Sequence, residues 1–215
     1  NIHSYQMDII KFLSIRKNDK QKWVKYYDIE TYKYYNYIVD ILPTNTNILE
    51  IGSGGGIFYN KHKDALIAKN NKYTGIDINE DNIQYSNSKC DYVDFHVNDI
   101  CNYTESEFRQ FDMLLLVQSY IQIPNIEDVF KRYFIANPKG SIIMVNTIFP
   151  DFLGKIMTLC KTHVLPRLLN NDCVSGTALT IRDIDNLRNH LDREVTNLKI
   201  CRSLSGFDEY VTIIR

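Results

Sequence analysis

Short apolar runs alternate with helical stretches through most of this 215-residue chain. A short apolar run bounded by turn residues is typical of a buried strand, whereas apolar residues that recur every three or four positions are typical of a helix face. Residues 111–117 (FDMLLLV) are apolar almost throughout, which indicates a strand covered on both faces. On this pattern we expect five strands, at 47–51, 73–78, 92–97, 111–117 and 141–145.

The stretches between these runs have the apolar spacing of helices. They are residues 57–69, the segment through Ile83 and Tyr85, and the segment from Val129 to Phe134. An earlier stripe with the same spacing, residues 34–42, ends at Pro43. A strand–helix–strand order predicts right-handed βαβ units, and such units build a parallel sheet.

The end of the chain departs from this order. Thr180, with Asp183 three residues later, predicts the start of a last helix. Two further strands, near 195–201 and 210–214, lie so close together that they predict an antiparallel hairpin. We therefore expect a three-layer, doubly wound α/β fold, with a seven-stranded, mostly parallel sheet and a C-terminal antiparallel hairpin at its edge.

Two segments fall outside the alternation. Residues 1–42 are interpreted as a helical arm or cap, which precedes a domain of residues 43–215. Residues 151–176 hold many apolar side chains, and they are too long for an ordinary connection in a βαβ unit. We expect this insertion to be a mobile lid over a substrate, although a helix lying on a membrane surface would show the same mixture of apolar and basic residues.

Composition and charge narrow the class of protein. The formal net charge is −1, so no field of one sign would attract nucleic acid over the whole surface. The five cysteines include no C-x-x-C pair, which argues against a zinc site and against a secreted disulfide framework. No run is apolar and long enough for a membrane span. We expect a cytoplasmic protein with free thiols and no bound metal; the sequence leaves its oligomeric state open between monomer and dimer.

The clearest chemical signal lies in residues 48–56 (ILEIGSGGG), where a strand leads into a glycine-rich turn and then a helix. Glycines let the backbone turn tightly and let a ligand approach the peptide closely. The first turn of the following helix offers free N–H groups. We therefore expect a nucleotide-like ligand at the carboxyl ends of the parallel strands.

The spacing of the glycines separates the possible ligands. A dinucleotide fingerprint requires a third glycine or alanine where this chain has Ile57 or Tyr59, and no Gly-Lys-Ser/Thr follows as in a P-loop. The pattern is instead E-x-G-x-G-x-G, with Glu50 before the first glycine. A carboxylate there adds little for a pyrophosphate, but it suits a ligand that carries a cationic amino group.

This pattern resembles motif I of the class I S-adenosylmethionine-dependent methyltransferases. Two further acids fall where that family places them, because Asp77 ends the second strand and Asp99 follows the third. The resemblance implies that Asp77 accepts from the ribose hydroxyls and Asp99 from the adenine amino group. Residues 137–140 (NPKG) are similar to another turn of the family in a different order, and the resemblance extends over residues 30–215.

The cofactor implied by the resemblance is S-adenosylmethionine. The residues implied for it are Glu50, Gly52, Ser53, Gly54, Gly56, Asp77, Ile78, Asp99, Ile100, Gln118 and Tyr27. The two aspartates also have a structural reading, since Asp77 could cap the next helix and Asp99 could form a turn.

The family's substrate pocket lies beyond the fourth strand, where this chain reads VQSYIQIP over residues 117–124. The Asp/Asn-Pro-Pro-Tyr motif of enzymes that methylate exocyclic amines and glutamine amides is not there, so we expect transfer to an oxygen or nitrogen of a small-molecule metabolite. The candidate catalytic residues are His163, in the expected lid, and Tyr120, which could equally pack against the following helix. The alternatives are a noncatalytic binding subunit with this fold and, less favoured, a nicotinamide-dependent oxidoreductase.

Overall fold

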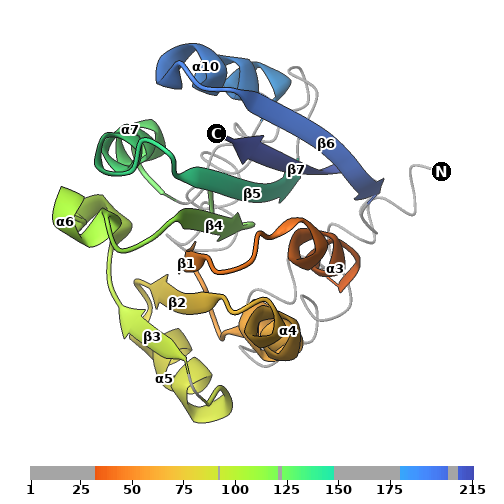
Figure 1. Ribbon diagram of the computed structural model, residues 1–215, viewed down its shortest axis with the longest axis vertical. Helices are drawn as coiled ribbons and strands as arrows, with labels where there is room; N and C mark the ends of the chain where they lie inside the picture. The colour runs from red at the N-terminus through yellow and green to blue at the C-terminus, as the bar shows by residue number, and fades with distance from the viewer. Residues whose placement is uncertain (1–31, 92, 121–122, 148–179, 203–207) are drawn as a thin grey trace, which may run out of the picture.

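A computed structural model of the chain describes residues 32–91, 93–120, 123–147, 180–202 and 208–215 (Figure 1). These residues form one seven-stranded sheet in the order β3-β2-β1-β4-β5-β7-β6. The strands are β1 (Asn47–Ile51), β2 (Lys72–Asp77), β3 (Asp94–Val97), β4 (Met113–Val117), β5 (Ser141–Thr147), β6 (Val195–Arg202) and β7 (Asp208–Ile214). Strands β1 to β5 are parallel, and β7 runs antiparallel to both β5 and β6. The expected fold class is confirmed, including the antiparallel hairpin.

The strand order places a switch point beside β1. From β1 the chain moves outward to β2 and β3, and it then returns to the other side of β1 as β4 and continues to β5. The loops that follow β1 and β4 therefore leave the sheet in opposite directions. In doubly wound folds the crevice that opens at such a point, beyond the carboxyl ends of the strands, is where ligands bind.

Helices cover both faces of the sheet and produce three layers. On one face lie α3 (Tyr32–Ile41), α4 (Ile57–Ala68) and α5 (Glu80–Lys89); on the other lie η1 (Ile100–Asn102), α6 (Glu105–Phe108), α7 (Ile126–Ala136) and α10 (Ile181–Leu191). Figure 1 shows α3 and α4 on one side of the sheet and α6 and α7 on the other. Each face has its own apolar core, with Phe58 and Ile38 in one and Phe130 and Tyr133 in the other.

The predicted start of the last helix is confirmed at the level of its hydrogen bonds. The Thr180 hydroxyl accepts from the Asp183 backbone N–H, and the Thr180 backbone N–H donates to the Asp183 carboxylate at 2.7 Å. The same box, made by Thr104 and Glu107, begins the short helix α6, which the apolar spacing did not reveal. A helix of one turn has too few apolar positions to show a period, so only its cap residues could have indicated it.

Several element boundaries differ from the expected ones. The fourth strand begins at Met113 instead of residue 111, because the Asp112 carboxylate accepts the Asn47 backbone N–H at 2.8 Å and so closes the end of the ladder. The third strand begins at Asp94 and is shorter than expected. The fifth strand is longer, since it pairs with β7 as far as Thr147.

Some predictions fall outside the described residues. The helical arm before residue 32, the lid at 151–176, Tyr27 and His163 all lie there, and they remain predictions. Within the part of the chain that the structure describes, no helix is long and apolar enough to cross a membrane. Those residues also contain no cluster of three metal-ligating side chains.

Candidate cofactor-binding site

The glycine loop joins β1 to α4 through three residues with positive φ. Gly52, Gly54 and Gly56 have φ values of 72°, 55° and 69°. These values lie in the left-handed region, which a residue with a Cβ enters at a cost of roughly 1–2 kcal/mol. The alternate spacing of the glycines in the sequence thus corresponds to an alternate left-handed backbone in the loop.

The three glycines face different surroundings. A Cβ at Gly52 would lie 2.6 Å from the Cβ of Ser119, and one at Gly56 would lie 2.9 Å from the Phe95 ring. A Cβ at Gly54 would meet no atom within 4 Å. Gly52 and Gly56 are therefore needed for packing inside the protein, whereas the bare backbone of Gly54 borders open space. That arrangement fits a ligand that approaches the peptide closely at Gly54.

Hydrogen bonds to β2 and from the segment after β4 hold the loop. The backbone N–H groups of Gly52 and Ser53 both donate to the Ile76 carbonyl of β2, at 2.8 and 2.9 Å. From beyond β4, the Ser119 hydroxyl donates to the Ile51 carbonyl at 2.5 Å. The Ser53 hydroxyl, in contrast, is buried without a hydrogen-bond partner. These hydrogen bonds hold the loop in one conformation, and the Ser53 hydroxyl takes no part in them.

Asp77 ends β2 and turns its carboxylate toward the loop. Its Oδ2 accepts the Gly54 backbone N–H at 2.9 Å, and its Oδ1 accepts the Asn79 backbone N–H at 2.8 Å. A carboxylate has about four lone-pair directions, so both oxygens keep capacity for further donors. Ile78, the next residue, is 76% exposed, which is unusual for a large aliphatic side chain at the end of a buried strand. Asp77 and Ile78 thus offer an acceptor and an apolar surface side by side.

Asp99 lies at the corresponding place after β3. Its carboxylate accepts the Cys101 backbone N–H at 2.9 Å and caps the short helix η1. Ile100 is 3% exposed and packs in the core, so its side chain does not reach the surface of the site. Arg132 of α7 donates to the carbonyl groups of Cys101 and Tyr103, at 2.9 and 2.6 Å, and fixes the segment that follows Asp99.

Glu50 does not project into the crevice. It is 3% exposed on the face of β1 that α4 covers, and its carboxyl group accepts a hydrogen bond from the Tyr73 hydroxyl of β2. Burial raises the pKa of Glu50 to about 8; the bond from Tyr73 opposes this rise, and the negative charge of Asp77 adds to it. Glu50 is therefore mainly protonated at neutral pH, and it supports the loop from below.

Sequence reasoning missed Tyr73, Gly75 and Ser119. A Cβ at Gly75 would lie 2.4 Å from the Phe95 ring, so the close contact of β2 and β3 beneath the loop requires glycine. The only local signal was the position of this glycine two residues before Asp77. The contacts of Tyr73 and Ser119 join residues 23 and 68 positions apart, and no spacing pattern reveals them.

The sequence placed two candidate residues beyond β4, Gln118 and Tyr120. Gln118 has a φ of 59° and donates its backbone N–H to the Val145 carbonyl of β5 at 2.8 Å. Tyr120 is 7% exposed and packs against the tilted Phe130 ring of α7, with the ring centroids 6.2 Å apart, which agrees with the packing interpretation of this residue. Burial raises the pKa of the Tyr120 phenol, and the nearby Glu127 and Asp183 raise it further. A phenol with a raised pKa is a poor general base at neutral pH.

Comparison with known proteins agrees with this geometry. A family model described as a methyltransferase domain matches residues 42–197. None of the curated proteins matches the chain. Among solved structures, the chain is similar to a Haloferax volcanii protein described as a putative methyltransferase in complex with the Trm112 activator, with a TM-score of 0.64, 11% identity, and coverage of 90% of this chain and 93% of that one.

Two further structures contain a methyl donor or its product. Human N-acetylserotonin methyltransferase, in complex with SAM, has a TM-score of 0.61 and 13% identity; the match covers 91% of this chain but 54% of the human one. The plantazolicin methyltransferase BpumL, in complex with a desmethylPZN analog and SAH, has a TM-score of 0.60 and 18% identity, over 97% of this chain and 91% of that one. At these identities the likeness establishes the fold. The family match, together with the glycine loop and the strand order, places the chain in the methyltransferase domain family as a class I enzyme that uses S-adenosylmethionine.

Proposed function

We propose that this protein transfers the methyl group of S-adenosylmethionine to an oxygen or nitrogen of a small-molecule metabolite. The observation that carries the proposal is the segment after β4. There the chain has Gln118, Ser119 and Tyr120 in place of Asp/Asn-Pro-Pro-Tyr; the Ser119 hydroxyl is engaged with β1 and the Tyr120 ring is packed against α7. Neither side chain is arranged to hold a flat amine or amide, so targets of that kind are disfavoured.

The proposed cofactor contacts follow from the geometry of the loop and the strand ends. The backbone at Gly54 allows close approach, the free lone pairs of Asp77 accept from the ribose hydroxyls, and the exposed Ile78 contacts the adenine ring. Asp99 accepts from the adenine amino group, and the core-packed Ile100 contributes only backbone. When bound, S-adenosylmethionine supplies a methyl group on a positively charged sulfonium. The residues of this chain then position the acceptor and keep water away.

The proposed part of Glu50 differs from the one implied by the resemblance. Because its carboxyl group faces Tyr73 under the loop, we propose that it supports the loop backbone and does not form a direct ion pair with the cofactor. A neutral carboxyl at this place also avoids adding a second uncompensated negative charge beside Asp77 while the site is empty of cation. Tyr27 and His163 keep their proposed roles, in cofactor closure and as a base, outside the described residues.

The similar structures support a small acceptor without identifying it. One of them is a geranyl diphosphate methyltransferase in complex with GPP, and another is the plantazolicin enzyme named above. The complex of the archaeal protein with the Trm112 activator favours a second candidate, in which the chain needs a protein partner for activity. A noncatalytic subunit would retain the fold but not need the open Gly54 backbone, and a nicotinamide enzyme would need a different glycine pattern.

A methyl-transfer screen tests the proposal. The protein is incubated with S-adenosylmethionine that carries a labelled methyl group, together with a cell extract that is afterwards divided into metabolite, protein and nucleic-acid fractions. We expect label in the metabolite fraction only. Label in the protein or nucleic-acid fraction would contradict the proposed substrate class, and calorimetric preference for NAD over S-adenosylmethionine would contradict the cofactor.

A further inference from the structure

Buried polar side chains in the described residues nearly all have hydrogen-bond partners. Seven such side chains are buried, and five of them are bonded: Thr46, Glu50, Ser86, Ser119 and Thr212. The two exceptions are the Ser53 hydroxyl, in the cofactor loop, and the Nδ2 amide nitrogen of Asn146, which is 3% exposed. One further buried atom without a partner, Nε2 of His62, belongs to a half-buried side chain of α4 on the other face of the sheet. An unpaired buried donor destabilises the folded state by roughly 1–3 kcal/mol, so its presence in a native fold requires an explanation.

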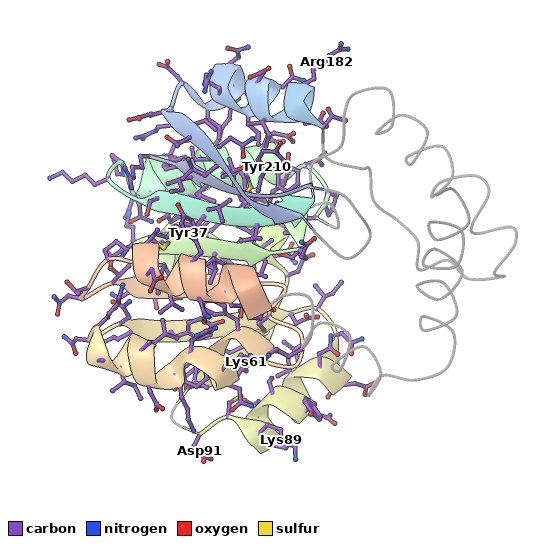
Figure 2. The ribbon with its side chains drawn as sticks, turned by 90° about the vertical axis from the view of Figure 1, so that its right-hand side faces the viewer. Tyr37, Lys61, Lys89, Asp91, Arg182 and Tyr210 are labelled. Atoms are coloured by element: carbon purple, nitrogen blue, oxygen red, sulfur yellow. The ribbon has the colours of Figure 1, made fainter. Side chains whose placement is uncertain are left out.

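Asn146 lies at the carboxyl end of β5, one residue beyond the last pair between β4 and β5. That pair is Val117 with Val145, and the Gln118 backbone N–H also reaches the Val145 carbonyl. Asn146 is thus level with Gln118, beside the segment that follows β4. On its other side its register partner is Tyr210 of β7, which Figure 2 shows in the sheet layer below α10.

The surroundings of Asn146 are apolar. Side chains alternate along a strand, so Asn146 shares its face of β5 with Ile142 and Met144, which belong to the core under α7 and α10. Tyr120 is part of the same core, and Tyr210 packs against it. A charged group would lose its hydration in apolar surroundings of this kind, whereas an uncharged molecule with a hydrogen-bond acceptor would be accommodated.

We propose that Asn146 is a specificity-determining residue, which donates a hydrogen bond from its amide to an uncharged carbonyl or hydroxyl oxygen of the methyl acceptor. An apolar wall with one well-placed polar group is the usual composition of a small-molecule site. The methyl acceptor would accept the hydrogen bond that the Asn146 amide does not make in the folded protein, and this bond would contribute to the free energy of binding. This inference rests on the proposed function, since it assumes that the acceptor is a small molecule.

The test compares stability, cofactor affinity and methyl transfer in one set of variants. Asn146→Leu has similar volume and no polar atoms, so we expect its melting temperature to stay the same or rise by about 2–4 °C, because an unpaired amide is removed. Its affinity for S-adenosylmethionine should stay within twofold of the wild type. Transfer of labelled methyl into the metabolite fraction should fall at least tenfold in kcat/KM, and Asn146→Asp, which replaces the donor by an acceptor, should show the same loss.

A matched control is Thr212→Val on the neighbouring strand. Thr212 is 2% exposed and its hydroxyl donates to Asn197 at 2.9 Å, so its removal should lower the melting temperature and leave transfer unchanged. If Asn146→Leu instead lowers the melting temperature and leaves transfer unchanged, Asn146 is structural and the inference is wrong. A large loss of cofactor affinity would place Asn146 in the cofactor site, which also overturns it.

The proposed function fails separately. If the wild type labels proteins or nucleic acids instead of metabolites, the substrate class is wrong. The effect of Asn146→Leu on that transfer then still decides whether the amide contacts the acceptor.

Discussion

Replacement of Glu50 by glutamine should make the protein more stable, by an amount that depends on pH. Glu50 is buried beneath the glycine loop, with the Tyr73 hydroxyl as its hydrogen-bond donor. Glutamine has the same shape, stays neutral at every pH and keeps a carbonyl oxygen that accepts from Tyr73. Glu50→Gln therefore removes the ionisation of this side chain and changes little else.

The magnitude follows from the difference in pKa between the folded and unfolded states. Burial raises the pKa of Glu50 from 4.5 to about 8, so between these values the folded protein keeps a proton that the unfolded chain releases. The stability of the wild type must then fall as pH rises, by about 1.4 kcal/mol per pH unit, until the loss levels off above pH 8. The free energy of unfolding falls by about 5 kcal/mol in all and by about 3 kcal/mol at pH 7. Both values are upper bounds, because protein relaxation and water penetration weaken the effect of burial.

Urea unfolding at pH 4.5, 6, 7 and 8.5, at constant ionic strength and without cofactor, measures this difference. We expect the two proteins to be equally stable at pH 4.5 and the glutamine variant to be increasingly more stable at higher pH. Burial also lowers the pKa of His62, so this side chain contributes stability that is lost as pH falls. That contribution is the same in both proteins, so it cancels in the comparison.

A carboxylate with the opposite behaviour provides the control. Hydrogen bonds from the Thr104 side chain and backbone lower the pKa of Glu107, so its carboxylate stabilises the protein at neutral pH and loses that effect as pH falls. Glu107→Gln should thus be the less stable protein at pH 7, and it should approach the wild type in acid. A Glu50→Gln variant that behaves in this way, or whose advantage does not change with pH, would show that Glu50 is ionised in the folded protein and would refute the reasoning.

Three further predictions concern the loop and its supports. Gly54→Ala should fold with a free energy of unfolding lowered by about 1 kcal/mol, because its backbone is left-handed, and should bind S-adenosylmethionine at least tenfold more weakly in calorimetry. Gly52→Ala should lower the free energy of unfolding by about 2 kcal/mol or more in urea, because its Cβ would meet Ser119. Unchanged affinity in a folded Gly54→Ala variant would contradict the loop assignment. Asp77→Asn should weaken cofactor binding more than Asp99→Asn, because Asp77 accepts the Gly54 N–H and is proposed to accept from two ribose hydroxyls. The reverse order in calorimetry would show that contacts to the adenine contribute more. Thr180→Ala should cost about 1 kcal/mol in unfolding and leave cofactor affinity unchanged, so a changed affinity would count against a purely capping role.

The sequence by itself determined most of the elements and the main chemical signal. The apolar runs predicted the strands, the Thr180–Asp183 box predicted the start of the last helix, and the glycine spacing predicted a tight turn between the first strand and the helix that follows it. These features depend on neighbours within a few positions, through side-chain alternation, capping bonds and the φ preference of glycine. Local preferences of this kind can be inferred from a single chain.

Only the tertiary structure decided what the polar side chains do. The face on which Glu50 lies and its bond to Tyr73, the bond from Ser119 to Ile51, and the unpaired amide of Asn146 all depend on strands that are distant in sequence and adjacent in the sheet. The sequence suggested that Glu50 is a carboxylate facing the ligand, whereas the structure buries it beneath the loop as a neutral carboxyl group. Its burial is set by the elements packed on the sheet. A spacing pattern carries no information on those contacts, because they form only when the sheet and its helices close around them.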